Sequence, residues 1–270
     1  MPIALVNGIR LHYDDTGGAG EPVVLVMGSG ASGQAWHLHQ VPALRAAGYR
    51  VITFDNRGIA PSDVCAEGFT IQDMVADLVG LLEVLGLSRC RLIGTSMGAY
   101  IVQELALLRP DLVQQAVLMA TRGRTDVLRA ALTRAEIELY DSGIEQPPLT
   151  HAVVQAMRNL SPRTLSNDVD IRDWLDIFEL TSGVGPGERQ QLALDPPPGR
   201  LVAYRSISVP VHVIAFQDDL VTPPELGREV AEAIPGASFE TVAGCGHYGY
   251  LEDPESVNKG VMEFFRTVQP

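Results

Sequence analysis

Short apolar runs alternate along the chain with longer amphipathic segments. Six runs stand out: VVLVM at 23–27, RVITF at 50–54, CRLIG at 90–94, QAVLMA at 115–120, VHVIAF at 211–216 and SFETVA at 238–243. Runs that are apolar at nearly every position are typical of strands buried on both faces. Segments of helical length separate the first three runs from one another. This alternation predicts an α/β fold with a parallel sheet and helices on both of its faces.

The N-terminus carries a different pattern. IALV at 3–6 and IRLHY at 9–13 are short β-type runs joined by Asn7-Gly8. Asn-Gly is the strongest local signal for a two-residue hairpin turn, so we expect an antiparallel hairpin at the start of the fold. Together with the six buried runs, it predicts a mostly parallel eight-stranded sheet. An amphipathic helix over 254–267 closes the chain.

Between residues 121 and 199 the strand signal disappears. The interval contains the helical stretches VLRAALTRAEIELY and DIRDWLDIFEL, is broken at Pro147, and ends at Gly199 after three prolines. Clusters of proline and glycine interrupt helices and mark loops. The sequence therefore predicts an α/β core made of residues 1–120 and 200–270, with a helical lid inserted at 121–199.

Composition narrows the function classes. The 270 residues are 46% hydrophobic and carry a formal net charge of −13, which fits one large globular domain. Nucleic acids and anionic membranes are held by clustered lysine and arginine, so the acidic balance argues against both as partners. It also disfavours a strongly anionic substrate. Cys65, Cys90 and Cys245 are too few and too far apart for a disulfide scaffold or a zinc cluster, so no metal is expected.

The chain shows no export signal. No stretch approaches the ~20 apolar residues of a membrane-spanning helix. The start MPIALVNGIRLHY also lacks a basic segment followed by an apolar run. With so few cysteines, these features favour the reducing cytoplasm.

A Gly-x-Ser-x-Gly turn, Gly94-Thr95-Ser96-Met97-Gly98, stands where the run RCRLIG ends and the helical run AYIVQELALL begins. The serine of such a turn has a strained backbone, and the small flanking residues let strand and helix approach closely. The Ser96 hydroxyl would then be exposed at the edge of the sheet, at the positive end of the following helix. Ser96 is the candidate nucleophile.

A serine nucleophile needs a base. His247 lies in the loop GCGHYG after the last predicted strand, at the carboxyl edge of the sheet, where ligands bind in open α/β folds. The other histidines fall in the hairpin, in predicted helices or within a strand: His12, His37, His39, His151 and His212. His247 is therefore the predicted base.

The base needs an acid that holds its tautomer. Asp218 and Asp219 both follow the run VHVIAF, again at the carboxyl end of a strand. Composition does not decide between them. The chain order serine, aspartate, histidine is that of one hydrolase architecture and differs from the orders in the two well-known serine protease folds.

Main-chain donors for an oxyanion are predicted in two places. Met27-Gly28-Ser29-Gly30 follows the run VVLVM, so backbone N–H groups there are placed to face the nucleophile. Met97 begins the helix that follows Ser96. We expect the N–H groups of Ser29 and Met97 to bind the oxyanion.

The same glycines permit a second interpretation. Gly28, Gly30 and Gly33 match the Gly-x-Gly-x-x-Gly fingerprint of dinucleotide-binding units, and Asp55 ends the next strand, where such a unit places its ribose-binding acid. This alternative explains neither the turn around Ser96 nor the aspartate and histidine loops. It is the weaker reading, and no nucleotide cofactor is expected.

With these residues in place, the chain resembles the α/β-hydrolase superfamily over nearly its whole length. It is most similar to small, cofactor-free bacterial members: esterases, lactonases, cofactor-free haloperoxidases and natural-product tailoring enzymes. The family's oxyanion segment His-Gly-x-Gly is matched at 27–30, except that Met27 replaces the histidine. The family's donor is the backbone after the first glycine, which implies Ser29 here. Loop support normally given by the histidine must come from elsewhere.

Two further segments carry the resemblance and refine the acid. Residues 55–63 are similar to the family's Asp-x-Arg-Gly-x-Gly-x-Ser segment, which supports the fold beside the site, with Ala60 in place of one glycine. In the family's acid loop the aspartate stands three residues past a glycine. That aspartate falls on Asp219, although Phe216 occupies the glycine position. The resemblance therefore implies Asp219 rather than Asp218.

The resemblance also bears on the reaction. Gly246-His247, followed by LEDP at 251–254, is close to the family's histidine loop. Epoxide hydrolases and haloalkane dehalogenases of this fold carry an aspartate where this chain has Ser96. A serine there implies acyl transfer.

Candidate substrate contacts are Trp174 and Phe178 on one predicted lid helix, together with Trp36, Tyr248 and Gly28 near the site loops. The aromatic residues could line an apolar pocket, but aromatic positions at helical spacing more often pack in a core.

Arg122 and Arg124 follow the strand at 115–120 and are candidates for contact with an anionic group. A solvated surface position is the expectation for both.

The sequence predicts a serine hydrolase that cleaves an ester, lactone or thioester of a small or natural-product-like substrate through an acyl-enzyme. One alternative is a tailoring enzyme that uses the same triad without net hydrolysis, as a carboxylate-eliminating lyase or an acyltransferase. Another is a ligand-binding receptor on the same fold. The expected partner is a small molecule, with no cofactor, and the oligomeric state stays open.

Overall fold

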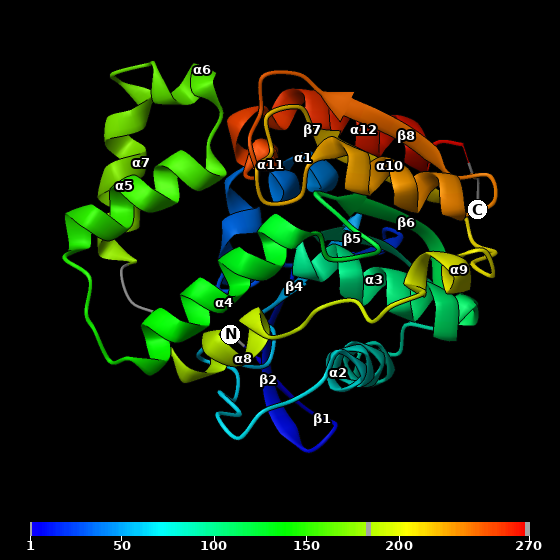
Figure 1. The fold of residues 1–270 in the computed structure, drawn as a ribbon. Helices are drawn as coiled ribbons and strands as arrows, with labels where there is room; N and C mark the ends of the chain where they lie inside the picture. The colour runs from blue at the N-terminus through cyan, green and yellow to red at the C-terminus, as the bar shows by residue number, and fades with distance from the viewer. Residues whose placement is uncertain (1, 182–184, 268–270) are drawn as a thin grey trace.

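One eight-stranded sheet organises the protein (Figure 1). The computed structural model describes residues 2–181 and 185–267. The strands are β1 (Ile3–Val6), β2 (Ile9–Asp15), β3 (Pro22–Val26), β4 (Arg50–Phe54), β5 (Cys90–Thr95), β6 (Val113–Met119), β7 (Val211–Phe216) and β8 (Ser238–Val242). Their order is β1-β2-β4-β3-β5-β6-β7-β8, antiparallel from β1 to β4 and parallel from there to β8. The predicted fold is confirmed.

The hairpin turn follows from its two residues. Asn7 has φ 45° and Gly8 has φ 78°, and the register places Val6 opposite Ile9. Both central residues of this turn need positive φ, which asparagine and glycine tolerate best.

Alternate strand residues face two separate cores. Val24 and Val26 of β3 pack in one core with α2 (Ile71–Val84), α3 (Met97–Leu108) and α10 (Pro224–Ala233). Val23 and Leu25 pack in the other core with α1 (Gln40–Ala46) and α12 (Pro254–Phe265). Figure 1 shows α2 and α3 on one side of the sheet and α1 and α12 on the other. The strands are apolar at consecutive positions because both faces are covered.

The described residues between β6 and α9 (Arg200–Tyr204) form five helices and no strand. They are α4 (Val127–Asp141), α5 (Pro148–Asn159), α6 (Pro162–Leu165), α7 (Asp170–Leu180) and α8 (Pro186–Leu192). Ala152, Ala156 and Leu160 pack with Phe178 in a small core of their own. In Figure 1, α5, α6 and α7 stand to one side of the sheet. We call residues 121–199 the lid, as in the sequence prediction.

The short elements complete the fold. They are η1 (Gly33–Leu38), η2 (Pro110–Leu112) and α11 (Gly249–Glu252).

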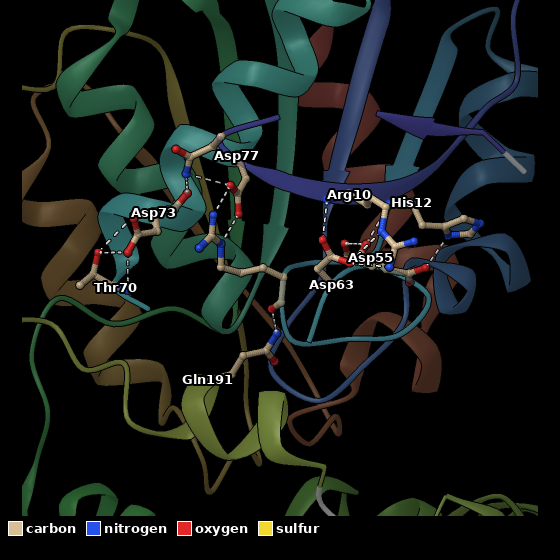
Figure 2. A network of polar contacts seen from close by, with 11 residues as sticks. Arg10, His12, Asp55, Asp63, Thr70, Asp73, Asp77 and Gln191 are labelled. Carbon is tan, nitrogen blue, oxygen red and sulfur yellow. Dashed lines mark hydrogen bonds and ion pairs between the residues drawn. The ribbon is translucent and has the colours of Figure 1, made fainter. Parts of the chain in front are cut away.

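A buried ion pair ties the loop after β4 to α2. Arg57 Nε and Nη2 donate to the two oxygens of Asp77, each at 2.5 Å, and Asp77 is 2% exposed. Asn7 of the hairpin turn also donates to Asp77, at 3.0 Å. Figure 2 shows Asp77 on α2 with these contacts. One carboxylate therefore connects the hairpin, the loop and a core helix.

Replacing this carboxylate should destabilise the protein strongly. Asp77→Ala leaves the Arg57 guanidinium buried without its counter-charge, and breaking a buried pair in this way costs about 3 to 5 kcal/mol. Urea unfolding monitored by circular dichroism gives the free energy of unfolding. Asp111→Ala removes an exposed partner of Arg109 and should leave the midpoint unchanged. Equal midpoints for the two variants would contradict the assigned role of Asp77.

Candidate active site

Ser96 stands in a sharp turn between β5 and α3. Its backbone has φ 55° and ψ −119°, a conformation that side chains rarely adopt. A Cβ on Gly98 would overlap the carbonyl oxygen of Val26, and a Cβ on Gly94 would overlap that of Gly98. The two glycines are therefore required by the close approach of strand and helix, and the turn presents Ser96 at the carboxyl edge of the sheet.

Two hydrogen bonds link Ser96 to a histidine and an aspartate from other strands. His247 Nε2 lies 3.1 Å from Ser96 Oγ, and His247 Nδ1 lies 2.8 Å from Asp219 Oδ2. Asp219 follows β7 and His247 follows β8, so the carboxyl ends of three parallel strands supply the three side chains. His247 is 7% exposed and Asp219 is 2% exposed. The structure brings the predicted nucleophile, base and acid together in hydrogen-bonded order.

Asp218 and Asp219 differ in their hydrogen bonds. Asp219 Oδ1 accepts from the N–H groups of Val221 and Thr222, both at 2.8 Å, and Oδ2 accepts from the Thr222 hydroxyl at 2.7 Å. These donors fix the carboxylate so that its second oxygen faces His247. Asp218 is half-buried, and its own N–H donates to the carbonyl of Cys245. Asp219, as the resemblance implies, is the residue that contacts the histidine.

The predicted oxyanion donors lie beside the serine. Ser29, Ser96 and Met97 line one cavity. The N–H groups of Ser29 and Met97 have no acceptor within residues 2–181 and 185–267. Gly28 lies against the nucleophile, since a Cβ there would be 3.2 Å from that of Ser96. Two main-chain donors next to a serine hydroxyl are what the oxyanion of an acyl-transfer intermediate needs.

Residues of the 55–63 segment hold residues 27–33, the loop that carries the predicted oxyanion donor Ser29 and that we call the oxyanion loop. Asp55 accepts from Ser32 Oγ at 2.6 Å and from Gly33 N at 2.8 Å, and it lies 2.6 Å from His12 Nδ1. Asn56 donates to the carbonyl of Met27 at 2.9 Å. Figure 2 shows Asp55 beside His12. Asp55 therefore supports this loop, in place of the ribose-binding role that the dinucleotide alternative gave it. Asn56 supplies support at Met27, the position where the family has its histidine.

Gln191 of α8 connects the lid to the same loop. Its Oε1 accepts from Gly30 N at 2.8 Å, and its Nε2 donates to the carbonyl of Arg57 at 2.8 Å. Figure 2 shows Gln191 reaching from α8 toward the loop of residues 55–63. Sequence reasoning missed this residue, because a single glutamine in a predicted helix gives no signal of its partners.

Glu252 connects the lid to the histidine loop. Its Oε2 accepts from Gly246 N at 2.6 Å, next to His247. Its Oε1 accepts from Ser161 N at 2.9 Å, Ser161 Oγ at 2.7 Å and Thr164 Oγ1 at 2.5 Å, at the start of α6. One carboxylate thus holds both the lid and the catalytic loop in place.

The aromatic residues predicted as substrate contacts lie elsewhere. Trp36 has no exposed surface and packs in the core, 4.9 Å from the ring of Tyr250. Trp174, Phe178 and Tyr248 form an aromatic cluster with centroid distances of 5.6 to 6.1 Å at the core of the lid. The structure places none of these four on the lining of the cavity beside Ser96. The helical spacing of Trp174 and Phe178 reflects packing in the lid core, which is the commoner cause of such a pattern.

Mostly polar residues line the cavity beside Ser96, in place of the predicted aromatic residues. Tyr100, Arg122, Arg129 and Gln191 line it, together with Leu194, Val221 and Thr222. The expectation that Arg122 lies on the solvated surface is wrong, since its side chain is 11% exposed. The side chain of Arg124 is 49% exposed and pairs with Glu229 at 2.7 Å, as a surface arginine would. Arg129 was not singled out by any sequence pattern.

The described residues contain neither a metal-binding cluster nor a membrane-spanning helix. Within 2–181 and 185–267, no three His, Cys, Asp or Glu side chains are arranged to hold a metal ion. No described helix has the length and apolar character that a membrane span requires.

The fold and the arrangement of Ser96, His247 and Asp219 define an α/β hydrolase. The sequence model of the alpha/beta hydrolase fold matches residues 21–254, and the chain belongs to this family. It is an enzyme of the hydrolase type.

Several relatives are known by name. The chain is 50% identical over 262 residues to the Mycobacterium tuberculosis protein named "Putative non-heme bromoperoxidase BpoC", covering 97% of this chain and 99% of that protein. The crystal structure of that protein superposes with a TM-score of 0.92 at 49% identity, over 96% of this chain and 97% of the other. A 2-hydroxy-6-oxononadienedioate/2-hydroxy-6-oxononatrienedioate hydrolase of Burkholderia vietnamiensis is 30% identical over 275 residues, covering 96% of this chain and 91% of that protein. The enol-lactonase of Burkholderia xenovorans LB400 superposes with a TM-score of 0.81 at 28% identity, over 98% and 100% of the two chains.

Proposed function

We propose that the protein is a serine hydrolase that cleaves a carboxylic ester or lactone of a small molecule through an acyl-enzyme. One observation carries the proposal. Asp219, His247 and Ser96 form a continuous hydrogen-bonded series that ends at a cavity, and two main-chain N–H groups without acceptors in the described residues line the same cavity. Nucleophile, base, orienting acid and oxyanion donors are the four parts that serine acyl transfer requires.

In the proposed reaction each of these groups has one role. His247 Nε2 takes the proton of Ser96 as Oγ attacks the carbonyl carbon, and the N–H groups of Ser29 and Met97 bind the oxygen that becomes negative. Asp219, held by Val221 and Thr222, orients the imidazole and stabilises its protonated form. His247 then passes the proton to the leaving oxygen, which yields the acyl-enzyme. A water molecule deprotonated by His247 attacks this ester and releases the acid product.

The relatives support this reaction class. The enol-lactonase and the dienedioate hydrolase both act by name as hydrolases, the first on a lactone. The natural substrate has to enter a cavity of only about 20 Å³, close to the space of one water molecule. We therefore propose that lid side chains rearrange when an ester binds, and that the substrate is small.

A serine-directed fluorophosphonate, followed by mass spectrometry, tests the reactive serine. The expected adduct is on Ser96 and is absent in the Ser96→Ala variant. Turnover in ¹⁸O-labelled water separates hydrolysis from elimination or transfer, because only hydrolysis must place solvent oxygen in the acid product. Products without solvent oxygen would favour the lyase or acyltransferase alternative. A ligand held tightly without adduct or turnover would favour a receptor.

Gln191→Leu should slow the chemical step without unfolding the protein. The substitution removes the hydrogen bond from Gly30 N in the oxyanion loop and the one to the carbonyl of Arg57 in the neighbouring loop. An oxyanion donor displaced by a fraction of an ångström loses much of its effect. We expect kcat on 4-nitrophenyl acetate to fall by about tenfold to a hundredfold.

Gln190→Leu is the matched control for this prediction. Gln190 is the neighbouring residue, and among the described residues its side chain bonds only to the carbonyl of Ala66, at 3.0 Å, so kcat should stay within about twofold. Equal losses in the two variants would show that α8 acts through general stability rather than through Gln191.

A further inference from the structure

Arg129 is a buried arginine that lines the cavity beside Ser96. The residue is 9% exposed. Within the described residues, its Nε and Nη1 have no hydrogen-bond partner, and no carboxylate forms an ion pair with it. Burial of a guanidinium without a partner is costly, and a ligand carboxylate in the cavity would supply that partner.

The charges around Arg129 do not balance. Four charged residues act on it: Arg122, Arg158, Glu136 and Asp195. Asp195 already pairs with Arg122 at 2.7 Å. Glu136 already pairs with Arg158. Three guanidinium groups therefore share two carboxylates, and burial lowers the pKa of Arg129 from its ordinary value. An arginine stays protonated even so, which leaves one surplus positive charge among these five residues.

The position of Arg129 in its helix adds to this charge. Asp126 caps α4 and accepts from the N–H of Arg129 at 2.7 Å, so Arg129 lies in the first turn. The N-terminal end of a helix carries partial positive charge and favours anions, whereas cations are favoured at the other end. The helix therefore does not offset the charge of Arg129.

We propose that Arg129 binds a carboxylate of the substrate, so that the enzyme acts on esters or lactones that bear a carboxylate near the scissile carbonyl. This rests on the proposed function, because it assigns a substrate class to the same cavity. A guanidinium binds a carboxylate through two parallel N–H···O bonds. Tyr100 also lines the cavity, and its buried hydroxyl, without a partner in the described residues, is a further donor. Since Arg129 and Ser96 line one cavity, a single ligand can contact both residues.

A purely structural role for Arg129 makes different predictions. Glu136 Oε2 is also buried without a partner among the described atoms, so a shift of the Arg129 side chain would let the two pair. In that case, replacement of Arg129 would lower stability and leave substrate preference unchanged.

Mono-4-nitrophenyl esters of succinate and glutarate, compared with their methyl esters, test the proposal. Each pair differs only in the free carboxylate. For at least one chain length, we expect kcat/KM for the free acid to exceed that for the methyl ester by about tenfold or more. A preference for the methyl ester at both lengths would overturn the proposal.

Substitutions test whether Arg129 is the residue that causes the preference for the free acid. Arg129→Met should abolish the preference by lowering kcat/KM for the free acid about tenfold or more, while the methyl ester changes by less than about threefold. Its melting temperature should not fall, since a buried unpaired charge is removed. Arg124→Met removes an exposed arginine and should change neither substrate. An unchanged preference in Arg129→Met would overturn the assignment.

Two further variants keep the test decisive if Arg129→Met does not fold. Arg129→Lys retains the charge without the bidentate fork and should keep a reduced preference. Tyr100→Phe should weaken the preference for the free acid alone. Full preference in both variants would count against the site.

Direct binding separates this inference from the proposed function. Succinate and glutarate should bind the Ser96→Ala protein in calorimetry, and Arg129→Met in that background should weaken binding about tenfold or more, whereas Arg124→Met should not. Binding without turnover by the wild type would mean that the hydrolase proposal fails while the carboxylate site stands. Turnover and fluorophosphonate labelling without carboxylate preference or dicarboxylate binding would mean the reverse.

Discussion

Ser96→Ala should reduce kcat on an activated ester such as 4-nitrophenyl acetate by about 10⁵-fold or more, because it removes the hydroxyl that bonds to the predicted base, His247 Nε2. The Oγ that is removed bonds to His247 Nε2 at 3.1 Å and makes no contact on which the fold depends. The melting temperature should therefore stay near that of the wild type. Steady-state kinetics and mass spectrometry of the acyl adduct provide the two measurements.

Ser29→Ala is the matched control in the same cavity. Ser29 is expected to act through its main-chain N–H, which alanine retains, so kcat should change by no more than about threefold. Turnover above about one hundredth of wild type in Ser96→Ala would refute the nucleophile. A large loss in Ser29→Ala would assign a function to its hydroxyl instead.

Asp219→Asn should lower kcat by about 10³-fold to 10⁴-fold with little effect on folding. Asparagine fits the same space, but its amide cannot hold the imidazole in the tautomer that accepts the serine proton, nor stabilise the protonated ring. The adjacent Asp218→Asn is a sharp control, since Asp218 is half-buried and lies outside the hydrogen-bonded series. It should change kcat by less than about threefold. Equal losses in the two variants would overturn the choice of acid.

Elements with strong local signals could be predicted from the sequence. The six apolar runs reflect strands covered on both faces, and the Asn7-Gly8 turn needs the positive φ values that it has. The three site residues were found because each directly follows a predicted strand, and parallel strands bring their carboxyl ends to one edge of a sheet.

Residues whose role depends on tertiary packing could not be predicted. Trp36 and Trp174 were chosen for their chemistry, but whether an aromatic ring faces a cavity or a core depends on which helices pack against it. Gln191 bonds to Gly30 and Arg57, both more than 130 residues away along the chain, and Arg129 lines a cavity formed by several separate loops. No local sequence pattern marks either residue. The formal net charge of −13 likewise does not indicate the excess of arginine around the cavity.

Two sets of hydrogen bonds attach the lid to the catalytic loops, and they limit which lid residues can be substituted without loss of activity. Gln191 in α8 bonds to the oxyanion loop, and the start of α6 is held through Glu252 of α11 to the loop that carries His247. These two lid helices are therefore constrained by catalysis. Helix α4, which contributes Arg129, contains neither attachment. We expect substrate range and catalytic rate to vary independently among related proteins. Substitutions in α4 would alter KM values and ligand choice, whereas substitutions at the two attachments would alter kcat for every substrate alike.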